Sequence, residues 1–213
     1  MEHYAPLAKL AAVQSPRRRT WLALLTVIAL ATCAGDVPHD DGLARGLADD
    51  GTRDSAVAQA VSSADSSLPL LLLWAEHPPT HVDRDGLYIG MADVFARLRA
   101  RAAIPFLIRN LGVTRDQIGV PWFKTAERIE NAYPMAAALI AIGPEACEAL
   151  AAASEQPMRR EDRLVAIFVV ARVISRGGSF PEAREYLSSA AGQANQERLW
   201  AEEGLRLLDE TPH

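Results

Sequence analysis

The chain has 213 residues, of which 49% are hydrophobic, 23% charged and 6% aromatic. This length buries one core of ordinary size, and the scarcity of β-branched and aromatic runs argues against a sandwich or barrel, so we predict an all-α protein. The formal net charge of −5 belongs to a surface that repels phosphate backbones, which argues against nucleic acid as a partner.

Residues 1–34 have the pattern of an export signal. Three basic residues, Arg17 to Arg19, precede an apolar run from Trp21 to Ala31, which is too short to span a bilayer. The acidic residues that follow favour a cleaved signal over the alternative, an uncleaved anchor. We therefore expect a secreted or cell-envelope protein. Removal of this segment would leave eight more acidic than basic residues.

Two cleavage routes stay open. Leu30, Ala31, Thr32 and Cys33 resemble the lipobox of bacterial lipoproteins, in which the Cys is lipidated and tethers the protein to the membrane, although that pattern prefers Gly, Ala or Ser at the place of Thr32. Ala29 and Ala31 also form an A-x-A site for ordinary signal peptidase. The segment Arg18 to Leu22 resembles a twin-arginine core, but no cofactor motif follows, so the general secretory route is the default.

Residues 35–67 are predicted to form a flexible tether, because Asp, Gly, Ala and Ser dominate and break any long apolar face. The one helix expected there is a short one between Ser55 and Val61. Residues 68–86 are predicted to be a Pro-rich lead-in loop. His77 and His81 with nearby carboxylates are residues that zinc accepts, but Pro78 and Pro79 prevent a helix from aligning the two imidazoles. We therefore expect no metal site.

Residues 87–210 are periodic in the helical sense. Four helices are predicted with both limits: Leu87 to Ala102, Met135 to Ile142 ended by Gly143, Leu164 to Ile174, which we expect to be the most buried, and Leu199 to Leu208, a terminal cap. Three more are predicted from their starts: one at Pro105 that is capped by Gly112, one at Pro144, and one near Pro181 with Ser179 and Glu182 as a capping box.

A decapeptide occurs twice in this region. "PEACEALAAA" begins at Pro144 and "PEAREYLSSA" at Pro181, an offset of 37 residues. A period of this size with two helices in each unit is typical of stacked helical hairpins. We predict a short α-solenoid of stacked antiparallel helical hairpins. Cys147 within the repeat is matched by Arg184, so we interpret it as a buried helical residue, and two cysteines exclude a disulfide framework.

The segment Ala136 to Gly143, followed by Pro144 to Leu150, resembles the HEAT-like repeats related to those of phycobilisome lyases. The resemblance extends with less fidelity over Ala103 to Leu208. Tetratricopeptide repeats are the nearest alternative. The resemblance implies a scaffold that binds other proteins along a curved face. Lyase activity is not implied, because no bilin-binding Cys motif is visible.

The chain contains no G-x-S-x-G, Gly-rich phosphate loop, H-E-x-x-H or C-x-x-C motif. Glu161 and Asp162 stand between Arg160 and Arg163, where surface salt bridges are the expected use. We therefore expect a protein that is not an enzyme and that takes no cofactor and no small-molecule substrate.

Two surfaces are candidates for binding a protein partner. Trp122 and Phe123 follow Pro121 in an irregular segment and would serve as interface anchors, or alternatively fold back over the gap between repeats. The second candidate, a basic patch for an acidic partner, comprises Arg159, Arg160 and Arg163.

Three functions remain open at this level. The first is an extracytoplasmic interaction scaffold, free or tethered to a membrane. The second is an extracytoplasmic enzyme accessory or metal-binding protein that uses the loop of His77 and His81. The third is a repeat domain that only stabilises a larger assembly.

Overall fold

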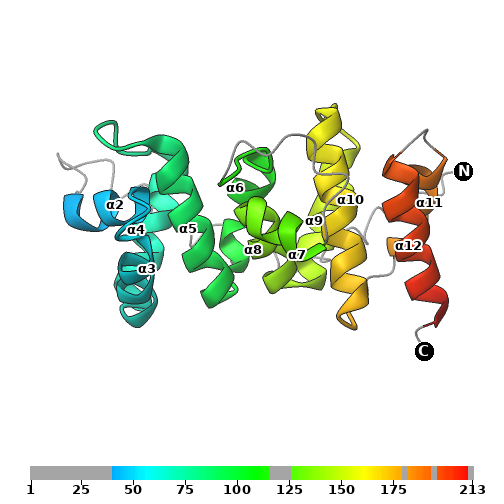
Figure 1. Cartoon of the computed structure of the whole chain (residues 1–213), viewed down its shortest axis with the longest axis horizontal. Helices are drawn as coiled ribbons and strands as arrows, with labels where there is room; N and C mark the ends of the chain where they lie inside the picture. The colour runs from blue at the N-terminus through cyan, green and yellow to red at the C-terminus, as the bar shows by residue number, and fades with distance from the viewer. Residues whose placement is uncertain (1–39, 116–125, 179–181, 193–195, 211–213) are drawn as a thin grey trace, which may run out of the picture. The chain divides into compact units, whose positions relative to one another are not determined.

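The structure is a computed structural model, and it describes residues 40–115, 126–178, 182–192 and 196–210. Within these ranges it contains helices and no strand (Figure 1), which confirms the all-α prediction. In chain order the elements are α2 (Asp41–Ala48), α3 (Arg53–Ser62), α4 (Ala64–Glu76), α5 (Arg84–Leu98), the 3-10 helix η1 (Arg101–Ala103), α6 (Ile104–Arg109), α7 (Ala126–Ala132), α8 (Pro134–Ile142), α9 (Pro144–Ser154), α10 (Arg160–Ser175), α11 (Ala183–Ala191) and α12 (Gln196–Glu210).

The region predicted as a flexible tether is helical from Asp41 onward, so that prediction is wrong for residues 40–67. Asp40 caps α2 by accepting a hydrogen bond from the backbone N–H of Leu43 at 3.1 Å. Leu47 of α2 is fully buried, and so is Ala60 of α3. Leu43 and Leu47 lie four residues apart on the buried face of α2, whereas α3 buries mainly small residues, so the overall dominance of Asp, Gly, Ala and Ser was misleading here.

The predicted lead-in loop is also mostly wrong, because α4 continues to Glu76 and α5 begins at Arg84. Trp74 is a fully buried core residue of α4. Only the segment between α4 and α5, with His77 and His81, is a loop. Residues 40–86 belong to the same compact unit as the helices that follow.

Two glycines let α2 approach α5 closely. A Cβ on Gly90 would lie 2.4 Å from the carbonyl oxygen of Leu47, and a Cβ on Gly86 would lie 2.4 Å from that of Ala48. Any side chain at these positions would collide with backbone. The spacing of four residues places both glycines on one face of α5, so α2 and α5 contact each other backbone to backbone.

Most helix boundaries predicted at proline and glycine between α6 and α9 agree with the structure. Pro105 lies in the first turn of α6, and Pro144 begins α9 directly after α8 ends. Gly143 joins α8 to α9 with φ of 93°, a conformation that side chains disfavour. The predicted cap at Gly112 is wrong, because α6 ends at Arg109 and Asn110 is its cap.

The two copies of the decapeptide bury corresponding side chains. Ala146 and Leu150 of α9 are fully buried, as is Leu187 of α11, and Ala183 of α11 is 1% exposed. The copies differ at their starts, because α11 begins at Ala183 with Glu182 as its cap. The predicted capping box cannot be assessed, since Ser179 lies outside the described residues.

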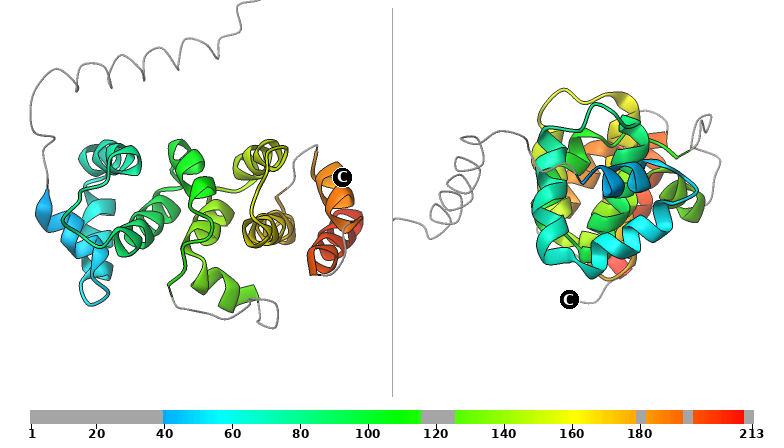
Figure 2. Two further views of the ribbon diagram at one scale, coloured as in Figure 1. Left: turned by 90° about the horizontal axis from the view of Figure 1, so that it is seen from above. Right: turned by 90° about the vertical axis from the view of Figure 1, so that its left-hand side faces the viewer.

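Helices distant in sequence form one series of contacts and one further pair. In the series, α5 packs against α8, α8 against α10 and α10 against α12; in the further pair, α6 packs against α9 (Figures 1 and 2). Of the described helices, α10 has the most buried residues, ten of sixteen, although α8 buries a larger share, seven of nine. An ion-pair cluster ties α7 to α10, because Glu130 binds Arg172 and Arg176, each at 2.7 Å.

The last helix, α12, packs against both α10 and α11. Ala201 is fully buried, and the ring of Trp200 meets that of Phe168 edge to face at 5.2 Å between centroids. Glu202, Arg206 and Asp209 are exposed, as expected for a terminal helix. The side chain of Leu208, predicted to point inward, is outside the described set.

Among the described residues, no single helix is long and apolar enough to cross a membrane. The pair α3 and α4 reaches that length and composition only together, and the two helices are bent by 119° at their junction.

Candidate binding depressions

Of the residues predicted to bind or to carry lipid, three lie outside the described residues: Cys33, Trp122 and Phe123. The other three are Arg159, Arg160 and Arg163, which lie at the start of α10. Arg159 lines a surface depression, and Arg160 and Arg163 are not among its lining residues. The basic patch of these three arginines stays a prediction.

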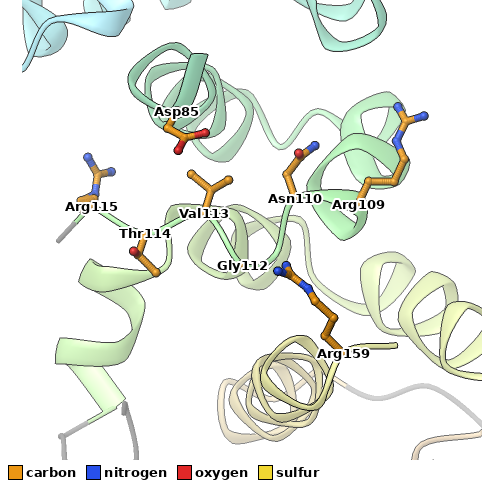
Figure 3. Close-up of a pocket in the computed structure, with 8 residues that line it drawn as sticks. All are labelled: Asp85, Arg109, Asn110, Gly112, Val113, Thr114, Arg115 and Arg159. Atoms are coloured by element: carbon orange, nitrogen blue, oxygen red, sulfur yellow. The ribbon is translucent and has the colours of Figure 1, made fainter. Parts of the chain in front are cut away.

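The depression that contains Arg159, here called the arginine depression, has a volume of about 390 Å³. It is formed by the segment after α6, the first turn of α5 and the residue before α10. Figure 3 shows Arg109 and Arg115 on opposite sides, with Arg159 beside Gly112. Its lining residues are Asp85, Arg109, Asn110, Gly112, Val113, Thr114, Arg115 and Arg159.

Each arginine of the depression is paired with a carboxylate from its own chain. Arg109 Nη2 lies 2.5 Å from Glu76 Oε1, and this hydrogen bond is the main reason that the pKa of Glu76 is lowered. Arg115 Nη2 donates to Asp93 Oδ1. These pairs join α6 to α4 and the segment after α6 to α5, and they fix where the arginine head groups stand.

Arg159 is held by a third carboxylate. Its Nε and Nη2 donate to the two oxygens of Asp162 at 2.7 and 3.0 Å, a bidentate geometry that raises the pKa of Arg159, chiefly through the hydrogen bonds. Asp162 therefore forms the surface salt bridge that the sequence predicted for this acidic pair. A Cβ on Gly112 would lie 2.4 Å from Arg159 Nη2, so the absence of a side chain at Gly112 leaves room for the guanidinium.

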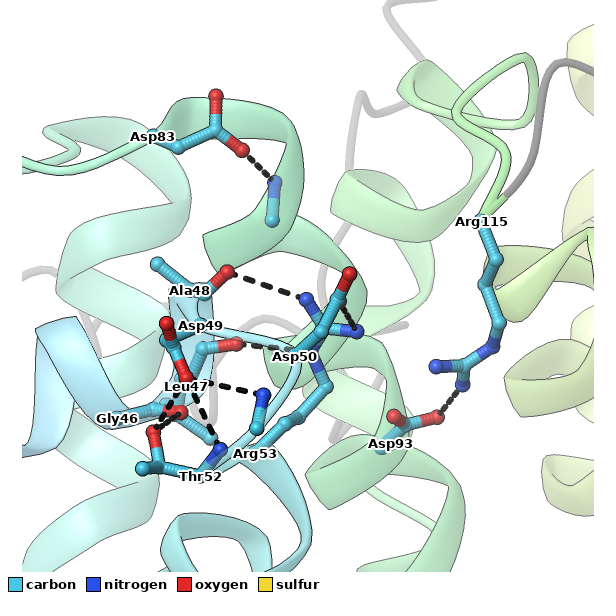
Figure 4. A network of polar contacts seen from close by, with 12 residues as sticks. Gly46, Leu47, Ala48, Asp49, Asp50, Thr52, Arg53, Asp83, Asp93 and Arg115 are labelled. Carbon is cyan, nitrogen blue, oxygen red and sulfur yellow. Dashed lines mark hydrogen bonds and ion pairs between the residues drawn. The ribbon is translucent and has the colours of Figure 1, made fainter.

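A second depression of about 460 Å³, here called the acidic depression, adjoins the first. Both are lined by Asp85, Thr114 and Arg115. The acidic depression is lined in addition by the α2–α3 turn and the start of α5, whose side chains appear in Figure 4. Its carboxylates are Asp49, Asp50, Asp83 and Asp85. The two neighbouring depressions thus carry charges of opposite sign.

Most carboxylates of the acidic depression have a structural task. Asp49 accepts hydrogen bonds from the backbone N–H groups of Gly51 and Thr52 at 2.9 and 3.1 Å, and Asp83 accepts one from Gly86 at 2.6 Å, which caps α5 (Figure 4). Asp50 pairs with Arg53 at 2.5 Å. These carboxylates close turns and helix ends, so their clustering has a local explanation.

The histidine loop does not assemble a ligand set. His81 Nε2 lies 3.1 Å from Asp41 Oδ1 on α2. Across the described parts of the chain, no group of three or more His, Cys, Asp or Glu residues is placed to hold a metal ion. The structure thus supplies no geometry for the metal-binding alternative.

Cys147 is fully buried on α9, as the sequence predicted. Burial, and to a smaller degree the charge of Glu148, raises the pKa of the thiol to about 12. A thiol with this pKa is a packing residue and a poor nucleophile at neutral pH.

Sequence reasoning found one of the three arginines of the depression. Arg109 and Arg115 have no distinguishing local pattern. Arg109 is the last residue of α6 and Arg115 lies in the segment after it, and only the packing of α5, α6 and α10 places them in one depression with Arg159. The segment Arg109 to Arg115 gave no signal of its own, since these two arginines are its only charged residues.

Comparison of the chain with protein-family models, with curated proteins and with solved structures gives no match.

Proposed function

We propose that this chain is a non-catalytic, extracytoplasmic protein-interaction scaffold, built as a short α-solenoid of HEAT-like helical hairpins. The predicted signal in residues 1–34 places it in the cell envelope or outside the cell. It is either released after cleavage at Ala31 or tethered through a lipid on Cys33. Catalysis and cofactors have no part in this proposal.

The observation that carries the proposal is the contact series from α5 to α12. In a solenoid each hairpin contacts its neighbours in sequence, so that the first helices of successive hairpins form one layer and the second helices form another. The series from α5 through α8 and α10 to α12, and the α6 to α9 contact, are what such layers predict. The buried positions shared by α9 and α11 support the repeat.

The shape of the surface also favours binding over chemistry. The two depressions are open, polar and lined by charged side chains, whereas small-molecule sites are predominantly apolar and enclosed. Surfaces of this kind suit charged segments of another protein, and they extend over several helices, as solenoid binding faces do.

The experiment is capture of the full-length, C-terminally tagged chain from the envelope of its native host, with mass analysis of its N-terminus and of the proteins that co-purify. We expect a stoichiometric protein partner and an N-terminus that is either diacylglyceryl-Cys33 or the residue after Ala31. A Cys33→Ser variant is the matched control, since it removes lipidation and leaves the helices unchanged.

Two outcomes would contradict the proposal. Recovery of the chain from the cytoplasm with residues 1–34 intact would overturn the extracytoplasmic location. Recovery without a partner but with stoichiometric metal, which is lost in a His77→Ala/His81→Ala variant, would favour the metal-binding alternative.

A further inference from the structure

We propose that the arginine depression seats a short acidic segment of the partner protein. This inference rests on the proposed scaffold function and specifies the chemistry of the contact. Its recognising groups are the guanidinium groups of Arg109, Arg115 and Arg159, and its ligands are carboxylates spaced along an extended chain.

The arginines keep unused hydrogen-bonding capacity. A guanidinium has five N–H donors and no acceptor. The described contacts use two donors of Arg109, one of Arg115 and two of Arg159. The remaining donors of these half-exposed side chains can bind only acceptors, and carboxylates match their geometry best.

The head groups are also ordered before a ligand arrives. Each is held by its own carboxylate, and these carboxylates come from α4, α5 and α10. Because these side chains are already ordered, less conformational entropy is lost when a ligand binds. Arg109 and Arg115 stand on opposite sides of the hollow (Figure 3), so an extended segment with more than one carboxylate fits the arrangement better than a single small ion does.

The surroundings limit the length of the acidic segment. A volume of about 390 Å³ holds only a few side chains. The adjoining acidic depression, which begins at Asp85, repels further negative charge. A long polyanion such as nucleic acid is disfavoured by the same charges. The fitting ligand is a short acidic stretch followed by neutral or basic residues.

Asp85 supplies a test that does not depend on loss of folding. It lies in the wall of the arginine depression and opposes a bound carboxylate. Asp85→Asn should therefore tighten binding, and an unfolded variant cannot gain affinity. Asp54→Asn is its matched control, because Asp54 is also an exposed carboxylate in the first turn of a helix but lines neither depression.

The probe is a dye-labelled tetraglutamate peptide, with tetraglutamine and tetralysine as controls, measured by fluorescence anisotropy at low salt with the purified chain. We expect tetralysine, which the acidic depression attracts, to be unaffected by loss of the arginines, tetraglutamine not to bind, and tetraglutamate to bind. Arg109→Gln/Arg159→Gln should weaken it about tenfold, because each lost charge pair is worth a few-fold. Asp85→Asn should tighten it about two- to threefold. The matched double variant Arg45→Gln/Arg184→Gln, which removes two arginines from other exposed ion pairs, should leave binding unchanged.

Equal weakening by both double variants, or no change with Asp85→Asn, would overturn the inference. Circular dichroism confirms that each variant is folded. The captured partner separates this inference from the scaffold proposal. If the Arg109→Gln/Arg159→Gln variant still captures the partner, the scaffold proposal holds, and the proposed binding of an acidic segment in the arginine depression is wrong. If tetraglutamate binds as expected but no partner is captured, the scaffold proposal fails alone.

Discussion

Arg53 is a buried charged side chain whose hydrogen bonds explain its position. Its Nε and Nη2 donate to the carbonyl oxygens of Leu47 and Ala48 at 3.0 and 3.2 Å, at the C-terminal end of α2, and its Nη1 pairs with Asp50. A cation is favourable where a helix ends and leaves carbonyl groups unpaired. Although Arg53 borders the acidic depression, its role is structural, so it is unsuitable as a probe of binding.

Cys147 leads to a prediction at the scale of one residue. With a pKa of about 12, its thiolate fraction at pH 8 is on the order of one in ten thousand, and burial also blocks access. In a Cys33→Ser background, we expect no measurable reaction of Cys147 with a chromogenic disulfide reagent in the native state, and complete reaction in denaturant.

The same shift sets a direction for stability at high pH. The folded thiol keeps its proton above pH 9, where the unfolded thiol loses it, so stability falls as pH rises through the unfolded pKa.

Rapid labelling of the native Cys33→Ser chain at pH 8 would contradict the buried position of Cys147.

At the scale of elements, the α2–α5 contact predicts a strong effect of Gly90. Gly90→Ala places a methyl group against the carbonyl of Leu47, and because backbone cannot rotate away as a side chain does, α2 must shift. We expect the free energy of unfolding to fall by about 1 to 3 kcal/mol, measured by chemical denaturation.

Gly192→Ala is the matched control for this change. Gly192 caps α11 with φ of −70°, and a Cβ there would approach no closer than 3.5 Å to its neighbours. We expect it to be neutral or slightly stabilising, because it reduces the freedom of the unfolded chain. Similar losses in both variants would show that α2 does not pack tightly on α5.

Local sequence signals predicted some elements well. The α8–α9 junction follows from Gly143 and Pro144 alone, because glycine permits the positive φ and proline fits the first helical turn. The helices α2 and α4 escaped prediction, and of α3 only the part between Ser55 and Val61 was expected. Small residues dominate the buried face of α3, whereas α2 and α4 do bury apolar side chains at helical spacing, among them Leu47 and Leu71, in segments too short to stand out from the polar residues around them.

At the scale of the whole molecule, residues 40–62 are predicted to be part of the folded core. Burial of the side chains of Leu43, Leu47 and Val57 stabilises the fold by about 5 kcal/mol. A chain that begins at residue 63 should therefore melt at least about 10 °C below a chain that begins at residue 35. Thermal denaturation followed by circular dichroism measures this difference. Equal melting temperatures would restore the interpretation of this region as a tether.

The sequence by itself determined that the chain is helical, that Gly143 and Pro144 separate α8 from α9, and that Cys147 is buried. These features depend on residues close together in sequence, whose preferences act locally. Only the tertiary structure decided that residues 40–76 join the core and that Arg159 lines the same depression as Arg109 and Arg115. Such groupings depend on which helices pack together, and packing is set by the shape of many distant side chains at once.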